Sequence, residues 1–340
     1  MTDMPAETKA GDGRLTGELL RSVSRSFYIS IRLLPRRLRE PVGLAYLLAR
    51  ATDTVADTAD VDALVRSETL MDLRSLIEGQ APPERVREIA QSFSTLQQAS
   101  DERRLIEALP DCLHRLHRLN SPDREDVRAV LRKIIKGQAL DVARFGDAKQ
   151  IRALETDRDL HEYTYLVAGC VGEFWTQLCF RHVRNFAEWP ENEMIELGKR
   201  YGAGLQLINI LRDAHADLQV GRCYFPKEEL DAVGVAPSEI LVEPDRIDLV
   251  YDKWLEEAQH GLNAGIKYVH GIRNRRIRGA TALPALIGAR TLKLLRAAGP
   301  AALHHRIKVP RNEVRRMLAS VGLALAGRAK IEKMFRREFD

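Results

Sequence analysis

Apolar residues recur at three- and four-residue steps along most of this 340-residue chain, as in the segments Val127–Ile135 and Leu255–Val269. This spacing puts apolar side chains on one face of an α-helix. No stretch alternates between apolar and polar residues as a half-buried strand would. The pattern therefore predicts an all-α helical bundle. Because there is no internal repeat and no long linker, we expect a single domain over residues 15–340, after a disordered tail over residues 1–14.

The predicted helices end where glycine, proline and asparagine gather. These breaks fall at residues 79–83, 120–122, 146–147, 188–193, 221–226 and 299–300. Such residues favour turns and cannot easily continue a helix. The last but one of these breaks is a loop that could close over a site or simply end a helix.

Composition narrows the class of protein. Hydrophobic residues make up 45% and charged residues 30%, as in soluble globular proteins. No apolar run approaches the roughly 20 residues that span a bilayer, and the polar N-terminus does not resemble a signal peptide. Four cysteines without Cys-x-x-Cys spacing indicate reduced thiols. We expect the chain to act in the cytoplasm, either free or peripherally bound at the inner membrane face.

The net charge of +5 is accompanied by basic clusters at residues 32–39 and 273–278. These clusters lack the interleaved aromatic residues of a nucleic-acid binder, so we expect no nucleic-acid partner. Anionic substrates, a membrane surface or a merely solvated face each fit the clusters. Oligomeric state leaves no mark in the sequence.

Two aspartate pairs with a spacing of four residues suggest the chemistry: Asp53 with Asp57, and Asp213 with Asp217. Four residues advance an α-helix by about 6 Å and turn it about 40° past one circle, so each pair lies on one face. Asn209 lies one turn before the second pair. Two such faces opposed across a bundle would suit a magnesium-bound diphosphate, because Mg²⁺ combines a few carboxylates with water and phosphate oxygens.

Each aspartate pair ends an apolar stretch, where unpaired carboxylates are costly. Arg50 and Arg212 lie beside the pairs and could be ordinary ion-pair partners or diphosphate clamps. Small residues also gather after Tyr163, at residues 167–172. Glycine costs about 1 kcal/mol in a helix interior relative to alanine. Its presence there indicates close approach of either another helix or an apolar ligand.

Taken together, these residues resemble the squalene/phytoene synthase family of head-to-head prenyl transferases, and most of all its bacterial squalene synthases. Five segments in this order carry the resemblance: Ser24–Phe27, Arg50–Asp57, Tyr163–Gly172, Gln206–Asp217 and Gly221–Pro226. The resemblance implies an isoprenoid synthase helical bundle with a central active-site cavity.

The family resemblance also implies roles for individual residues. Magnesium and the substrate diphosphates would be held by Asp53, Asp57, Asn209, Asp213 and Asp217. The diphosphate oxygens would be gripped by Ser24, Arg25, Ser26, Arg50, Arg212 and Arg222. Tyr163 would assist ionisation and proton removal. The substrate pocket would be lined by Phe27, Tyr46, Val167, Ala168, Gly169 and Gln206. Lys308 and Arg311 are weakly similar to a basic segment that contacts NADPH.

The implied reaction has two halves. Two molecules of farnesyl diphosphate first condense to presqualene diphosphate, with Mg²⁺ and arginines drawing off one diphosphate. Presqualene diphosphate then ionises, rearranges and takes a hydride from NADPH to give squalene. The form Val23-Ser-Arg-Ser-Phe27 and the run beginning Ala282-Leu-Pro284 are both more similar to squalene synthases than to carotenoid-type members.

Two positions depart from the squalene-synthase pattern. Ala280 stands where the family has Phe, and Ala285 where it has Gln. Both positions are linked to the second half-reaction, so the alternatives are a dehydrosqualene or phytoene synthase, or an enzyme that ends at presqualene diphosphate or hydroxysqualene.

Three other kinds of protein share some of these features. A class I terpene cyclase normally has Ser or Thr and then Glu after the Asn, whereas this chain has Asp213 and Asp217. A catalytically silent assembly or binding factor would tend to lose the aspartates that are retained here. A membrane-surface scaffold would use the basic clusters instead and would not need the aspartates.

Overall fold

The computed structural model describes residues 15–24, 28, 31–32, 34–146, 150–324 and 328–339. The predictions for Arg25, Ser26 and Phe27 and for the tail over residues 1–14 lie outside these residues. The prediction of an all-α fold is confirmed, because helices make up most of the described chain. The chain forms two compact units, Met1–Ala143 and Arg144–Asp340.

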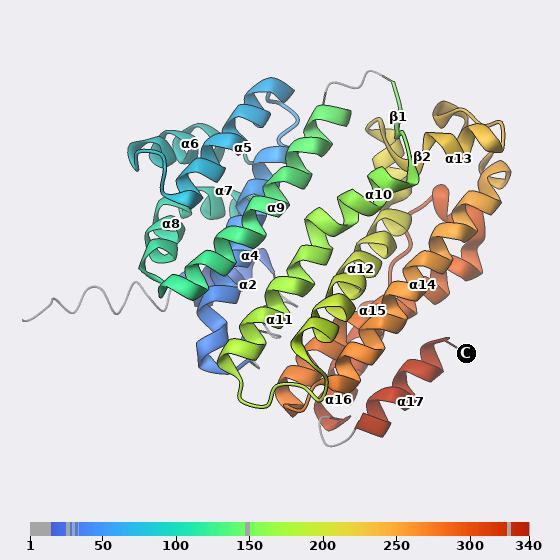
Figure 1. Cartoon of the computed structure of the whole chain (residues 1–340). Helices are drawn as coiled ribbons and strands as arrows, with labels where there is room; N and C mark the ends of the chain where they lie inside the picture. The colour runs from blue at the N-terminus through green and yellow to red at the C-terminus, as the bar shows by residue number, and fades with distance from the viewer. Residues whose placement is uncertain are drawn as a thin grey trace, which may run out of the picture. The chain divides into compact units, whose positions relative to one another are not determined.

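In the first unit, the shorter helices α5, α7 and α8 pack against the long helix α4 (Figure 1). Its α-helices are α2 (Leu20–Val23), α4 (Arg36–Asp57), α5 (Ala63–Glu78), α6 (Glu84–Ser94), α7 (Ser100–Glu107), α8 (Leu109–Arg118) and most of α9 (Ser121–Phe145).

Local signals explain where some of these helices begin and end. The Asp62 side chain accepts a hydrogen bond from the Leu64 amide at 2.8 Å and so caps the start of α5. Gly79 ends the same helix with φ of 76°, a left-handed conformation that glycine adopts without a steric cost. The predicted break at residues 79–83 therefore has a specific structural cause.

The second unit contains the longest helix, α12, which packs against α11 and α14 (Figure 1). Its α-helices are α10 (Asp157–Thr164), α11 (Cys170–His182), α12 (Glu191–Gln219), α13 (Lys227–Ala232), α14 (Asp248–Gly271), α15 (Arg275–Ala298), α16 (Arg311–Ala324) and α17 (Arg328–Phe339). A five-residue π-helical turn, η2 (Tyr165–Gly169), joins α10 to α11.

One feature of the second unit has no clear signal in the sequence. β1 (Arg152–Leu154) and β2 (Arg222–Pro226) form a short parallel pair in which Arg152 is opposite Arg222. The break predicted at residues 221–226 is thus a strand. This pairing fixes the chain that leaves the end of α12.

The helix α12 approaches its neighbours so closely that there is no room for side chains at the contacts. A Cβ atom at Gly172 of α11 would lie 2.0 Å from the carbonyl oxygen of Gly198, and one at Gly204 would lie 2.6 Å from the Cα of Gly261 on α14. Glycine at these positions allows backbone-to-backbone packing. The position of α12 is therefore set by direct contact between helix backbones.

The four cysteines are all buried and free, as the reduced-thiol prediction requires. Burial raises the pKa of the Cys112 thiol to about 12, so that it stays protonated at neutral pH. Among the described helices, none is long and apolar enough to cross a membrane.

Candidate active-site residues

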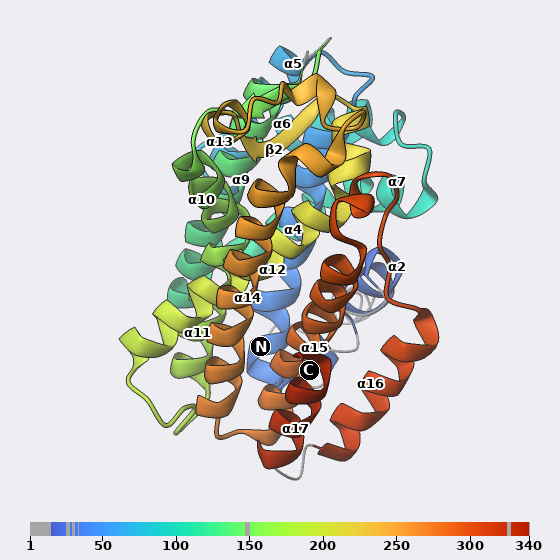
Figure 2. The same cartoon turned by 90° about the vertical axis from the view of Figure 1, so that its right-hand side faces the viewer.

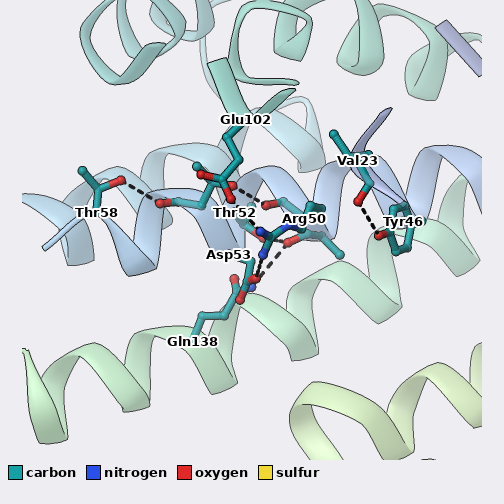
Figure 3. Close-up of polar contacts among 10 residues, drawn as sticks. Val23, Tyr46, Arg50, Thr52, Asp53, Thr58, Glu102 and Gln138 are labelled. Atoms are coloured by element: carbon teal, nitrogen blue, oxygen red, sulfur yellow. Dashed lines mark hydrogen bonds and ion pairs between the residues drawn. The ribbon is translucent and has the colours of Figure 1, made fainter. Parts of the chain in front are cut away.

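One face of α4 carries four of the predicted site residues. Tyr46, Arg50, Asp53 and Asp57 follow one another at steps of four, three and four residues and so project from the same side of the helix. Arg50 pairs with Asp53 through Nη1 and with Glu102 of α7 through Nη2, the latter at 2.8 Å from Oε1 (Figure 3). The guanidinium group is thus shared between two carboxylates.

The two carboxylates that share the Arg50 guanidinium group affect its pKa. Partial burial alone would lower the pKa of Arg50, but the neighbouring Asp53 and Glu102 carboxylates raise it above its ordinary value. Arg50 therefore remains a fixed positive charge beside the aspartate. A cation that bound Asp53 would have to compete with it.

Ser24 and Tyr46 lie together at the beginning of the same face. The Tyr46 hydroxyl donates to the carbonyl oxygen of Val23 at 3.5 Å (Figure 3) and is also hydrogen-bonded to the Ser24 side chain. Burial raises the pKa of Tyr46, and the Ser24 hydrogen bond and the Arg50 charge partly offset that rise. The structure thus brings together the predicted residues Ser24, Tyr46, Arg50 and Asp53.

Two residues of this region, Glu102 and Gln138, were not predicted from the sequence. Glu102 belongs to a charged segment that looks like any solvated helix face. Gln138 of α9 donates to the Ala49 carbonyl at 3.4 Å, while its buried Oε1 has no hydrogen-bond partner among the described residues. A buried, unpartnered amide oxygen near Asp53 (Figure 3) is a ready acceptor for a bound group.

The shared guanidinium group leads to a prediction for Glu102→Gln. Without the second carboxylate, Arg50 should pair more strongly with Asp53 and compete better with Mg²⁺. Partly exposed pairs of this kind contribute up to about 1 kcal/mol, so we expect the Mg²⁺ concentration for half-maximal pyrophosphate binding to rise roughly fivefold. Calorimetric titration with magnesium and pyrophosphate measures this shift.

The matched control for that experiment is Glu107→Gln. Glu107 is an exposed carboxylate at the end of the same helix. The Glu107→Gln substitution should leave the magnesium concentration for half-maximal pyrophosphate binding unchanged. An equal requirement in the wild type and in Glu102→Gln would show that Glu102 does not position Arg50.

In the second unit, one face of α12 carries Gln206, Asn209, Asp213 and Asp217. The Asn209 amide donates to Gln206 Oε1 at 3.4 Å. This contact orients the Asn209 side chain along the face. The spacing predicted from the sequence is therefore realised on a continuous helix.

Two arginines hold the Asp213 carboxylate. Arg212 reaches its two oxygens at 3.2 and 2.5 Å, and Arg306 approaches Oδ1 at 2.5 Å. Arg306 lies in the segment before α16, where sequence analysis had pointed to Lys308 and Arg311. Those two residues are exposed at the end of this segment and the start of α16.

Tyr163 is buried on α10 and stacks on Tyr224 of β2. The ring centroids are 5.0 Å apart with an interplanar angle of 24°, and the two hydroxyl groups are 3.3 Å apart. β2 follows α12 directly, and Asp217 lies close enough to help raise the pKa of the Cys223 thiol, although burial is the main cause. The β1–β2 pair thus places Tyr224 against the predicted catalytic tyrosine. Arg222, another predicted diphosphate ligand, is half-buried on the same strand.

This geometry gives a prediction for Tyr163→Phe. The substitution keeps the stacked ring and removes only the hydroxyl group, so the fold should persist. If the hydroxyl moves a proton or orders the leaving group, condensation should slow by about a hundredfold. Single-turnover measurement of product formation tests this.

Tyr224→Phe is the control, because it removes the same hydroxyl contact from the other side. It should slow the reaction less than Tyr163→Phe. A wild-type rate in Tyr163→Phe would assign that tyrosine to packing alone.

The small residues after Tyr163 have a packing explanation. A Cβ at Gly169 would meet the carbonyl oxygen of Lys199 at 3.1 Å, and one at Gly202 would meet that of Ala168 at 2.3 Å. Val167 packs partly buried against the core of the second unit. The sequence left open whether another helix or an apolar ligand approaches this cluster. Close approach of a helix accounts for its glycines.

The two aspartate faces fit magnesium in number and kind of ligand. Mg²⁺ commonly takes one or two carboxylates and completes its octahedron with water and substrate phosphate. Each face offers two carboxylates one turn apart, with Gln138 Oε1 or the Asn209 amide nearby on the respective unit. Within the described ranges, no three His, Cys, Asp or Glu side chains form a preassembled metal site.

Comparison with known proteins establishes the class of this protein. A sequence model of the family "Squalene/phytoene synthase" matches residues 20–313, and the chain belongs to that family. Its members are head-to-head isoprenoid prenyl transferases.

Individual relatives in this family have different activities. The chain is 30% identical to presqualene diphosphate synthase of Rhodopseudomonas palustris, with 85% of this chain and 89% of that protein covered. It is 26% identical to squalene synthase of Saccharomyces cerevisiae, covering 82% of this chain and 60% of the yeast protein. For a bifunctional lycopene cyclase/phytoene synthase of Phaeosphaeria nodorum the identity is 28%, covering 70% and 38%. The chain thus spans less than two thirds of the length of these two fungal relatives.

Solved structures share the fold. A ligand complex of TcSQS has a TM-score of 0.73 at 20% sequence identity and covers 96% of this chain and 97% of that one. A dehydrosqualene synthase bound to a ligand has a TM-score of 0.63 at 24% identity, with 95% and 99% covered. At these identities the likeness concerns the fold alone.

Proposed function

We propose that this chain condenses two molecules of farnesyl diphosphate head to head and forms presqualene diphosphate. The observation that carries the proposal is the convergence of Ser24, Tyr46, Arg50 and Asp53 on the α4 face. Hydroxyl groups, a guanidinium group and a carboxylate in this arrangement suit a metal-bound diphosphate. Membership of the family supports the reaction class.

Residues on both aspartate-bearing helices would bind magnesium and diphosphate. Asp53 and Asp57 on α4, and Asn209, Asp213 and Asp217 on α12, would hold magnesium-bound diphosphate. Mg²⁺ supplies Lewis-acid stabilisation of the departing diphosphate when bound. Further contacts to diphosphate oxygens would come from Ser24, Arg50, Arg212 and Arg222.

Tyr163 would act where the proton is lost. Its hydroxyl is buried and has the Tyr224 hydroxyl as a neighbour, which can orient it and relay a proton. Burial also keeps bulk water from this part of the protein, and a carbocation intermediate needs such exclusion. The tyrosine pair is thus suited to closing the cyclopropane ring by proton removal.

Two residues of α15 bear on which product the reaction would form. Ala280 and Ala285 are buried there and present methyl groups where the squalene-synthase pattern has Phe and Gln. Neither side chain can guide a cation or donate a hydrogen bond in a second half-reaction. The extended match to a relative named presqualene diphosphate synthase supports the same ending.

A full squalene synthase that uses NADPH is the second candidate. The run from Ala282 to Pro284 and the basic residues Lys308 and Arg311 favour it, because exposed cations can receive the phosphates of NADPH.

Product analysis separates the two candidates. Purified protein is incubated with farnesyl diphosphate and Mg²⁺, with and without NADPH, and the lipids are identified by mass spectrometry. We expect presqualene diphosphate in both reactions. Squalene only when NADPH is present would establish the second candidate, and the absence of any condensed product would refute both.

A further inference from the structure

Two helices carry as large an excess of basic over acidic residues as the whole chain. Together α16 and α17 contain eight basic and three acidic residues, an excess equal to the net charge of +5 for the whole chain. The rest of the sequence is therefore balanced in formal charge. Such an asymmetry indicates an anionic partner for these two helices.

The two helices pack beside α15 (Figure 2). Side chains of the three helices line an open cavity of about 580 Å³. All three helices belong to the second unit and pack on one another, with Met317 and Phe335 buried at the contacts. The cavity is separate from the α12 face, because none of the predicted site residues lines it.

Within the cavity the acidic groups are already neutralised. Arg290 of α15 lies 2.7 Å from Glu313 and 4.0 Å from Glu338. The same arginine lowers the pKa of the Glu313 carboxyl by hydrogen bonding, so this group remains an anion paired to Arg290. Arg290 is therefore the main partner of these carboxylates, and Arg316 adds a weaker charge interaction with Glu313.

Three further cations line the same cavity: Lys293, Arg316 and Arg337. In the part of the chain that the structure describes, none of them makes an ion pair. Leu286, Met317 and Met334 form an apolar portion of the wall. A ligand that combines an anionic oxygen group with an apolar body would complement this lining.

We propose that the cavity between α15, α16 and α17 binds the phosphate headgroup of an anionic phospholipid and docks the protein on a membrane surface. Lys330, Lys333 and Arg315 are exposed on the same two helices and add positive charge beyond what a single phosphate requires. An anionic membrane surface attracts such a face over its whole area. The inference does not depend on the proposed reaction.

Vesicle co-sedimentation tests the docking site. The full chain should bind phosphatidylcholine vesicles that contain phosphatidylglycerol, should not bind phosphatidylcholine alone, and should be released by salt. Each basic residue near an anionic surface strengthens binding about fivefold, so the triple variant K293Q/R316Q/R337Q should bind roughly a hundredfold more weakly.

The control variant is R273Q/R275Q/R276Q, which removes the same charge from exposed positions at and before the start of α15. It should retain most of the binding, and both variants should keep the circular dichroism spectrum of the wild type. An equal loss in the two variants would overturn the cavity as the site. Binding of inorganic phosphate at the cavity without vesicle binding would mean a soluble ligand and would overturn the membrane assignment.

Discussion

Replacing Asp53 by Asn should reduce pyrophosphate release by roughly 100- to 1,000-fold while the helical fold persists. Asn preserves the shape of the side chain and removes the charge that would hold magnesium. Arg50 should stay in place in this variant, because Glu102 remains as its second partner. Pyrophosphate production at saturating Mg²⁺ is the measurement, and Asp213→Asn should behave in the same way.

The matched control is Asp60→Asn, an exposed residue in the turn that follows α4. It loses the same charge a short distance along the chain and should react at the wild-type rate. Normal pyrophosphate release by Asp53→Asn would rule out the metal-binding role of the α4 face.

Gly172→Ala should destabilise the protein by about 3 kcal/mol, because its Cβ would lie 2.0 Å from the carbonyl oxygen of Gly198 and 2.4 Å from the carbonyl carbon. Both atoms belong to the backbone of α12, so no side chain can rotate away. The two helices must separate instead. Urea denaturation of wild type and variant gives the difference in unfolding free energy.

Gly322→Ala provides the comparison. Gly322 is an exposed residue of α16, and apart from the adjacent backbone of its own helix no described atom lies within 4 Å of the place that a methyl group would occupy there. Alanine favours a helix at such a position by up to about 1 kcal/mol. The substitution should leave stability unchanged or increase it. Equal stability of Gly172→Ala and wild type would mean that the α11–α12 contact tolerates a wider spacing.

Local patterns in the sequence predicted much of the helical fold. The apolar periodicity and the glycine, proline and capping residues are read over a few positions, which is the range over which a helix forms. The short β1–β2 pair could not be predicted in this way, because it joins segments about seventy residues apart and neither strand alternates. The division into two compact units likewise depends on contacts that the pattern does not encode.

In the candidate site, too, the sequence predicted local features but not contacts between distant segments. Tyr46, Arg50, Asp53 and Asp57 share a face because their spacing is helical, and this the sequence reveals. Glu102 reaches Arg50 from a separate helix, Tyr224 reaches Tyr163 across 61 residues, and Arg306 pairs with Asp213 from a segment before α16. Such partners carry no local signature, since only the folded chain brings them together.

Backbone-to-backbone contacts of α12 also bear on attempts to change the isoprenoid chain length of the proposed substrate. Laboratory evolution commonly enlarges or fills a binding pocket by varying the helix that carries its ligands. Gly198, Gly202 and Gly204 leave no freedom for such changes, because any side chain at these positions meets the backbone of a neighbouring helix. Libraries on α12 that spare the three glycines should therefore contain far more folded members.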